Sequence, residues 1–262
     1  MERLITSKAD VQALIHSQFF LQLMTLIEQK PPTLREIKAQ LGEKSEKLLN
    51  PLIKHGLIIR ENRRYYSGIQ VVVPDGELLK KWVPEILHVM GEMTRGQQLS
   101  LLEQLLYETP VIAVYRLPSE VPVAFRQSVS NGELTITSVS LNQQNATLPN
   151  YFKQLDEQTE AYRLLGDVNI PYYLDQVQVV LEKISAHRRR IRPSIFVESM
   201  KLFQLIDDEF QLLVPMIQQP INVSMMSEFQ KIAPIQQQLI LGAVMDALSL
   251  SDETLVQLCV RQ

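Results

Sequence analysis

The sequence predicts an α+β protein that is mainly α. Apolar residues recur at helical spacing along most of the 262 residues, while a few shorter stretches carry the β-branched and aromatic residues of hairpin strands. With 45% hydrophobic and 21% charged residues, the composition is that of a globular protein, and the length allows one large domain or two to three small ones. We therefore expect a chain that is folded over most of its length.

The first expected domain, residues 1–74, opens with a helix over 10–29. Its apolar side chains lie on one stripe, and the Pro31-Pro32 pair ends the helix because the residue before a proline is pushed out of the α region. Thr33 and Glu36 have the spacing of a capping box. A short second helix is therefore expected to start directly after Thr33.

A third helix is expected to begin at Ser45 as its cap and to end at Gly56. Its inner face is expected to hold four apolar residues: Leu48, Leu49, Leu52 and Ile53. Pro51 removes one backbone hydrogen bond from such a helix. Either the helix is kinked at this proline, or Asn50 caps a very short helix that starts at Pro51.

A basic hairpin follows the third helix. Residues 57–60 and 65–73 are rich in β-branched and aromatic side chains and predict two strands, joined by a turn over 61–64. A helix, a turn, a second helix and a tight basic hairpin, in this order, are typical of a winged helix-turn-helix. That module most often docks on DNA.

The second expected domain, residues 75–147, combines a helical pair with a β-hairpin. The dipeptide Asn131-Gly132 is the strongest short-range hairpin signal in the chain. The expected elements are helices near 76–90 and 96–108, a strand at 111–115 and hairpin strands within 121–129 and 134–139.

The third expected domain, residues 148–215, contains helices and a second hairpin. Residues 200–206 can be laid on 52–58, since both run from a helix into a strand. Asp207-Asp208-Glu209 would then form the turn and 210–214 the returning strand of a second winged-helix-like unit. This hairpin is acidic where the first is basic, so it is suited to touch protein rather than phosphate.

The last expected domain, residues 216–262, consists of two or three helices over 224–261. Its apolar stripe has eight members: Ile232, Ile235, Leu239, Ile240, Ala243, Val244, Ala247 and Leu248. The default role of such a stripe is to pack in the core. The alternative is a seam for a homodimer, through which DNA-reading proteins often double their contacts.

Charge is unevenly spread along the chain. The formal net charge is −3, but residues 1–73 hold eleven Lys and Arg against seven Asp and Glu. A basic head on an acidic body fits a nucleic-acid contact confined to the head. The candidate DNA-binding residues lie on the third helix and the hairpin: Lys44, Ser45, Lys47, Asn50, Lys54, Arg60, Arg63 and Arg64.

These residue types suit a helix in the major groove and a wing on the backbone. Asn pairs with adenine, Lys reaches guanine, and arginines at a hairpin tip contact phosphates or the minor groove. The opposing interpretation is a solvated surface on a module that binds protein. Three acids favour it, because each places a carboxylate among would-be phosphate contacts: Glu43, Glu46 and Glu61.

No cofactor or metal is expected, and nothing in the sequence supports an enzyme. The four histidines have no partner at i+4, and a single cysteine, Cys259, rules out an intrachain disulfide. The densest positive cluster, residues 188–192, fits cations at the C-terminal end of a helix better than an anion site.

Segments in the N-terminal part and in the later part of the chain resemble a known family. The head contributes Leu34-Arg-Glu-Ile-Lys-Ala-Gln and Ile59-Arg-Glu-Asn-Arg-Arg-Tyr65, and the later part contributes residues 150–173 and Arg192-Pro-Ser-Ile-Phe-Val-Glu198. They resemble an uncharacterised bacterial family, the domain of unknown function 1803, at both ends of residues 30–210. The resemblance implies a bacterial cytoplasmic protein, and it transfers no activity and no site residues.

Two functions follow as expectations. The first is a DNA-binding transcriptional regulator that acts through the N-terminal winged helix, as a dimer. The alternative is a non-enzymatic adaptor between proteins that uses winged-helix-like modules. The N-terminus lacks the apolar core of a signal peptide, and no apolar run approaches the ~20 residues that span a bilayer, so no membrane contact and a cytoplasmic location are expected.

Overall fold

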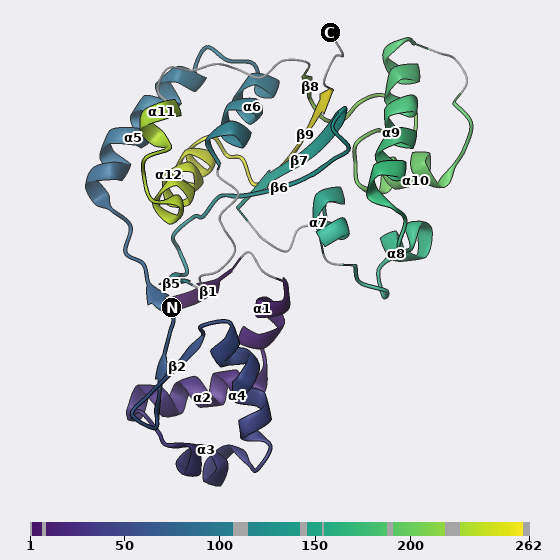
Figure 1. Cartoon of the computed structure of the whole chain (residues 1–262). Coiled ribbons are helices and arrows are strands. Elements are labelled where there is room, and N and C mark those ends of the chain that lie inside the picture. Colours follow the sequence, from purple (N-terminus) through teal and green to yellow (C-terminus); the bar gives the residue numbers. More distant parts are fainter. Residues whose placement is uncertain are drawn as a thin grey trace. The chain divides into compact units, whose positions relative to one another are not determined.

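The computed structural model describes residues 2–6, 9–106, 115–141, 146–153, 155–187, 191–217 and 226–258. The fold is α+β and mainly α, as predicted. The chain forms two compact units (Figure 1): the first unit is residues 1–73 with 109–121, and the second unit is residues 74–108 with 122–262. Cys259, residues 111–114 and residues 188–190 lie outside the described residues.

Four helices form the greater part of the first unit: α1 (Ala9–Ile15), α2 (Gln18–Gln29), α3 (Leu34–Leu41) and α4 (Ser45–Lys54). The single helix predicted over 10–29 is two helices. The break comes at Ser17, whose side chain accepts a hydrogen bond from Phe20 N and so caps a new helix start.

The capping box of α3 is confirmed. Thr33 N donates to Glu36 Oε2 over 2.5 Å, and Glu36 N donates back to Thr33 Oγ1. The helix ends at Gly42, whose φ of 97° favours glycine.

The start of α4 differs from the prediction. Lys44 is the N-cap residue without a side-chain hydrogen bond, and Ser45 Oγ donates instead to the Gly42 carbonyl over 2.5 Å. Pro51 lies inside one continuous helix, so α4 neither breaks nor restarts at Asn50. The missing N–H of Pro51 costs only the bond to the Lys47 carbonyl, one turn back.

The hairpin after α4 pairs β2 (Ile58–Glu61) with β3 (Arg64–Ser67) in antiparallel register. Asn62 and Arg63 form its two-residue turn with φ values of 49° and 61°, which are the angles of a type I′ turn. The strand predicted over 65–73 is split. Residues 70–71 form β4 (Gln70–Val71), which belongs to another sheet.

That other sheet has the strand order β1 (Glu2–Ile5), β5 (Tyr115–Pro118), β4, with β5 antiparallel to β1 and parallel to β4. It joins three segments that are far apart in the sequence. The core of the first unit lies among the helices and the hairpin and, in the described part of the unit, has eleven buried members: Val11, Ile15, Phe20, Leu23, Met24, Ile37, Leu49, Leu52, Leu57, Ile58 and Tyr65.

The second unit is built around a four-stranded sheet of order β6 (Phe125–Ser130), β7 (Leu134–Ser140), β9 (Asp252–Leu258), β8 (Met216–Ile217). The hairpin of β6 and β7 around Asn131-Gly132 is confirmed, with Gly132 at φ 93°. The helices α5 (Gly76–Met90) and α6 (Arg95–Leu105) confirm the predicted helical pair.

The C-terminal prediction is partly wrong. Helices α11 (Met226–Phe229) and α12 (Pro234–Ala247) lie in the segment expected to be helical, but residues 252–258 form strand β9. β9 pairs along its whole length with β7, from Leu134↔Leu258 to Ser140↔Asp252. The spacing of apolar residues in this short segment does not by itself distinguish a helix from a strand. Backbone pairing with β7, which is distant in the sequence, stabilises the strand.

Helices cover both faces of this sheet (Figure 1). One face packs on α5, α6, α11 and α12, and the other on α7 (Leu148–Lys153), α8 (Glu160–Leu165), α9 (Ile170–Ser185) and α10 (Ile195–Leu202). Successive side chains of a strand point to opposite faces of the sheet. Leu255 therefore packs in the core that faces α5 and α6, and Val256 packs in the core that faces α9 and α10. Of the eight residues of the C-terminal apolar stripe, Ile240 and Val244 lie in the core that faces α5 and α6, and Ile232 and Leu248 pack against it, which is the default role considered for the stripe.

The second hairpin is less regular than expected. Residues 206 and 212 form a single antiparallel bridge, and Leu213 N donates to the Leu205 carbonyl over 3.0 Å. Asp207 Oδ1 accepts from two backbone N–H groups of the turn, those of Glu209 and Gln211. The acidic segment after α10 is therefore a tight turn with one bridge rather than a pair of strands.

Candidate nucleic-acid interface

The outward face of α4 carries two lysines and an asparagine. Ser45, Leu49 and Leu52 are buried in the first unit. Residues 47, 50 and 54 are spaced three and four apart, so Lys47, Asn50 and Lys54 share the face opposite to the buried one, and all three are exposed. In the described part of the chain, none of these three takes part in an ion pair.

Ser45 was predicted on this exposed face, and that placement is wrong. Its side chain is fully buried and donates to the Gly42 carbonyl. A small hydroxyl suits this place because it satisfies a carbonyl in the tight turn between α3 and α4. Lys44, the residue before it, is exposed beside the start of α4.

Two of the four apolar residues predicted inside α4 lie outside. Leu48 is 45% exposed and Ile53 is 37% exposed. They lie on the two flanks of the buried stripe, because 100° per residue turns each of them well away from its centre. The solvent-facing surface of α4 is therefore a basic strip bordered by Glu46, with an apolar residue on either flank.

The acids near α4 are partly neutralised within the fold. Lys38 Nζ lies 2.9 Å from Glu46 Oε2. The hydrogen bond from Lys38 holds the pKa of the Glu46 carboxyl below its usual value, so Glu46 is ionised and paired at neutral pH. Glu43 and Glu61 remain exposed beside the basic residues.

The three arginines of the hairpin have different environments. Arg63 lies at the exposed tip, and Arg60 is exposed on β2 with its guanidinium 5.7 Å from the centre of the Tyr65 ring. Arg64 is half-buried and donates to the Pro31 carbonyl over 2.7 Å. The side chains of Arg63 and Arg60 can contact a ligand, whereas the side chain of Arg64 stabilises the fold.

The hairpin is attached to the loop before α3. Tyr65 N donates to the Pro32 carbonyl over 3.0 Å, and Thr33 forms an antiparallel bridge with Arg64. A short extended segment before α3 thereby pairs with β3. This pairing fixes the hairpin beside the helix pair and positions the tip within the same unit.

Metal binding and membrane spanning find no support among the described residues. Among them, no group of three His, Cys, Asp or Glu side chains is arranged to hold a metal ion. No helix in the described part of the chain is long and apolar enough to cross a membrane.

Comparisons with known proteins point to one family. Residues 3–106 match the family model described as Domain of unknown function (DUF1803), which confirms the resemblance for the N-terminal part of the chain. The matched span includes α5 and α6, and it does not extend to residues 150–198. Neither the curated proteins nor the solved structures gave a significant match.

Proposed function

We propose that the first unit is a winged helix-turn-helix that binds double-stranded DNA, and that the protein regulates transcription. The observation that carries the proposal is the outer face of α4, where Lys47, Asn50 and Lys54 stand together and the neighbouring acid of the helix, Glu46, is paired with Lys38. In this geometry α4 enters the major groove, and Arg63 at the hairpin tip rests on the phosphate backbone.

Three features of the first unit support this assignment. The helix pair α3 and α4 is followed directly by a two-stranded hairpin with a tight turn. The segment before α3 pairs with β3, which holds the hairpin as a wing beside the helices. Glu46 is paired with Lys38, so one of the three acids that oppose phosphate binding is already compensated. A regulator of this kind would work in the cytoplasm, where the chromosome lies.

The test is fluorescence polarisation with random genomic DNA duplexes over a series of NaCl concentrations. Wild type is expected to bind with an affinity that falls steeply with salt, since each phosphate contact contributes about −0.9 to the slope of log K against log salt concentration. The double variant Lys47→Ala/Lys54→Ala is expected to bind more weakly, and its slope is expected to be shallower by up to about 2.

The matched control is Lys231→Ala, which removes an exposed lysine of the second unit. It is expected to leave both affinity and slope unchanged. Wild type that fails to bind at low salt, or a double variant that behaves like the control, would remove the basis of the proposal.

The alternative function, an adaptor that docks on another protein, is favoured by one observation. Leu48 and Ile53 are exposed on both flanks of α4, where a protein partner would bury them. The double variant Leu48→Ser/Ile53→Ser separates the two functions. A DNA-binding role predicts nearly unchanged DNA affinity, whereas an adaptor role predicts no salt-dependent DNA binding in wild type and loss of a protein complex in the variant.

A further inference from the structure

A cavity lies in the second unit. Its volume is about 420 Å³, within the ~300–1,000 Å³ range of small-molecule pockets. It is formed where α7, the turn before α8, the start of α8 and the end of α10 meet. Its apolar wall consists of Tyr151, Ala161, Leu202 and Phe203.

Two aromatic rings dominate this wall. The Tyr151 and Phe203 ring centroids are 5.8 Å apart with 45° between their planes. The Tyr151 hydroxyl donates to the Gly166 carbonyl, which fixes the ring and uses its polar end inside the protein. The wall therefore offers flat apolar area to a ligand rather than a hydroxyl.

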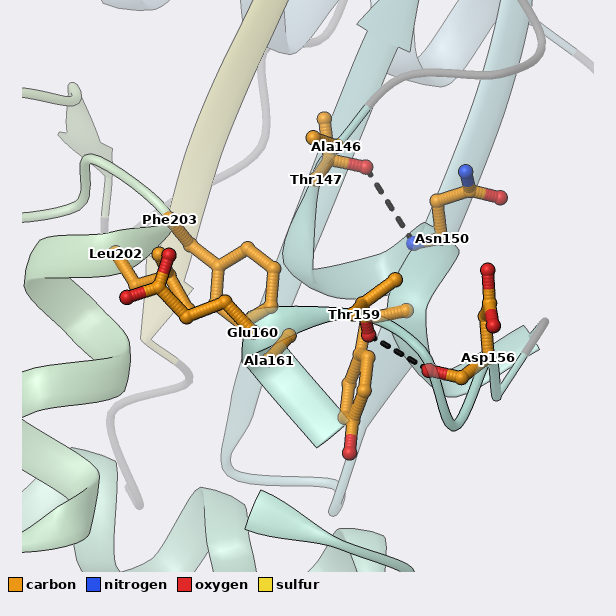
Figure 2. A pocket seen from close by; sticks show the side chains of 10 residues that line it. Ala146, Thr147, Asn150, Asp156, Thr159, Glu160, Ala161, Leu202 and Phe203 are labelled. Atoms are coloured by element: carbon orange, nitrogen blue, oxygen red, sulfur yellow. Dashed lines mark hydrogen bonds between the residues drawn. The ribbon is translucent and has the colours of Figure 1, made fainter. Parts of the chain in front are cut away.

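The two threonines of the cavity are also engaged. Thr159 Oγ1 donates to the Asp156 carbonyl over 2.7 Å, and Thr147 Oγ1 accepts from Asn150 N over 3.4 Å (Figure 2). Both hydroxyls stabilise helix starts, as N-terminal caps do. Selectivity among ligands is therefore expected to come from the charged residues of the cavity.

The charged residues that line the described cavity are both acids, Asp156 and Glu160. Both are exposed, and neither takes part in an ion pair with another described residue. Asp156 Oδ1 accepts from Gln158 N over 3.0 Å, which leaves its second oxygen to a ligand. The two carboxylates lie at separate ends of the cavity (Figure 2).

We propose that this cavity binds a small organic ammonium ion. The apolar body of the ligand lies against Phe203 and Tyr151, and its protonated nitrogen meets the carboxylate of Glu160 or Asp156. The rings offer apolar area to the body of the ligand, and the carboxylates attract its positive charge directly. An anionic ligand of the same shape meets repulsion from both acids.

The test uses three ligands of nearly equal size and different charge, titrated calorimetrically into the full chain: phenethylamine, 2-phenylethanol and phenylacetate. Phenethylamine is expected to bind with a Kd on the order of 1 mM, typical of so small a ligand. The alcohol is expected to bind about fivefold more weakly, and phenylacetate more weakly still. Equal binding of all three, binding of none, or a preference for phenylacetate would overturn the proposal.

Variants assign the binding to this cavity. Asp156→Asn/Glu160→Gln is expected to erase the preference for phenethylamine over the alcohol while leaving the alcohol's affinity unchanged. Glu157→Gln is the matched control, because Glu157 is an exposed acid of the same turn outside the lining. Phe203→Leu is expected to weaken both ligands at least twofold, and thermal unfolding of each variant verifies that the fold is kept. A charge preference that persists in the double variant would locate the binding elsewhere and refute the assignment.

This inference does not depend on the DNA-binding proposal, since the cavity and α4 belong to different units. Ligand selectivity and the salt dependence of DNA binding are separate measurements. Failure of either leaves the other standing.

Discussion

Arg63 and Arg64 are adjacent in the sequence and carry the same charge, but their side chains have different roles in the first unit. Arg63 has its Cα at the tip of the hairpin turn with a φ of 61°, and its side chain is exposed. Arg64, the next residue, turns back and donates to the Pro31 carbonyl over 2.7 Å. Arg63 belongs to the turn, whose backbone leaves strand geometry, whereas Arg64 is the first residue of β3 and bridges to Thr33.

The two arginines are therefore expected to respond differently to truncation. Arg64→Ala leaves the Pro31 carbonyl without its donor and is expected to lower the free energy of unfolding by about 1–2 kcal/mol, measured by urea denaturation. Arg63→Ala is expected to change stability by less than about 0.5 kcal/mol and, under the DNA-binding proposal, to weaken DNA affinity and flatten its salt dependence. Equal losses of stability in both variants would contradict this division of roles.

At the scale of elements, α3 owes its start to a charged cap. Two hydrogen bonds, first from Thr33 N and then from Thr33 Oγ1, hold the pKa of the Glu36 carboxyl below its ordinary value. A carboxyl whose pKa is lower in the folded state stabilises that state above its unfolded pKa. This stabilisation is lost as pH falls through the folded pKa.

Wild type is therefore expected to be more stable than Glu36→Gln at pH 7, and the difference is expected to shrink as pH falls below about 4.3. Urea unfolding followed by far-UV circular dichroism at pH 7, 5, 4 and 3 measures it. The helix α6 supplies a matched control, because its capping box pairs Thr94 with the neutral Gln97. The effect of Gln97→Ala is expected to stay constant over the same range. A Glu36→Gln difference that is also constant would rule out the charged cap.

The elements also show which features a sequence can reveal. The Thr33-Glu36 capping box and the Asn131-Gly132 hairpin are local signals, and local hydrogen bonds realise them. The strand β9 and the three-strand sheet of β1, β5 and β4 depend on pairing between distant segments, which no local spacing encodes. The burial of Ser45 likewise depends on the turn before α4.

The candidate sites divide in the same way. Lys47, Asn50 and Lys54 were predicted on one exposed face from helical periodicity, and their positions agree with it. The cavity of the second unit was not foreseen, because its lining comes from three helices separated in the sequence. Asp156 and Glu160 come to line a cavity with Leu202 and Phe203 only when α8 and α10 pack together.

At the scale of the whole molecule, the chain passes from the first unit to the second and back before completing the second. Residues 74–108 contribute α5 and α6 to the second unit, and residues 109–121 return to the first, where β5 pairs with β1 and β4. The described residues form one buried core in the first unit and two in the second, one on each face of its sheet. Because the two units have separate cores, we expect a core substitution in one unit to change the stability of that unit alone, even though segments of the two units alternate along the sequence.

Two substitutions of the same chemistry test this prediction. Ile37 in the first unit and Ile240 in the second are both fully buried, and Ile→Val at such sites typically costs about 0.5–1.5 kcal/mol. The single tryptophan, Trp82, packs in the same core as Ile240, so its fluorescence reports the second unit. Ile240→Val is expected to shift the urea midpoint seen by tryptophan fluorescence. Ile37→Val is expected to leave that midpoint in place and to shift only the remaining part of the circular dichroism transition. If both substitutions move the fluorescence midpoint equally, the two cores unfold as one cooperative body and the division into independent units is wrong.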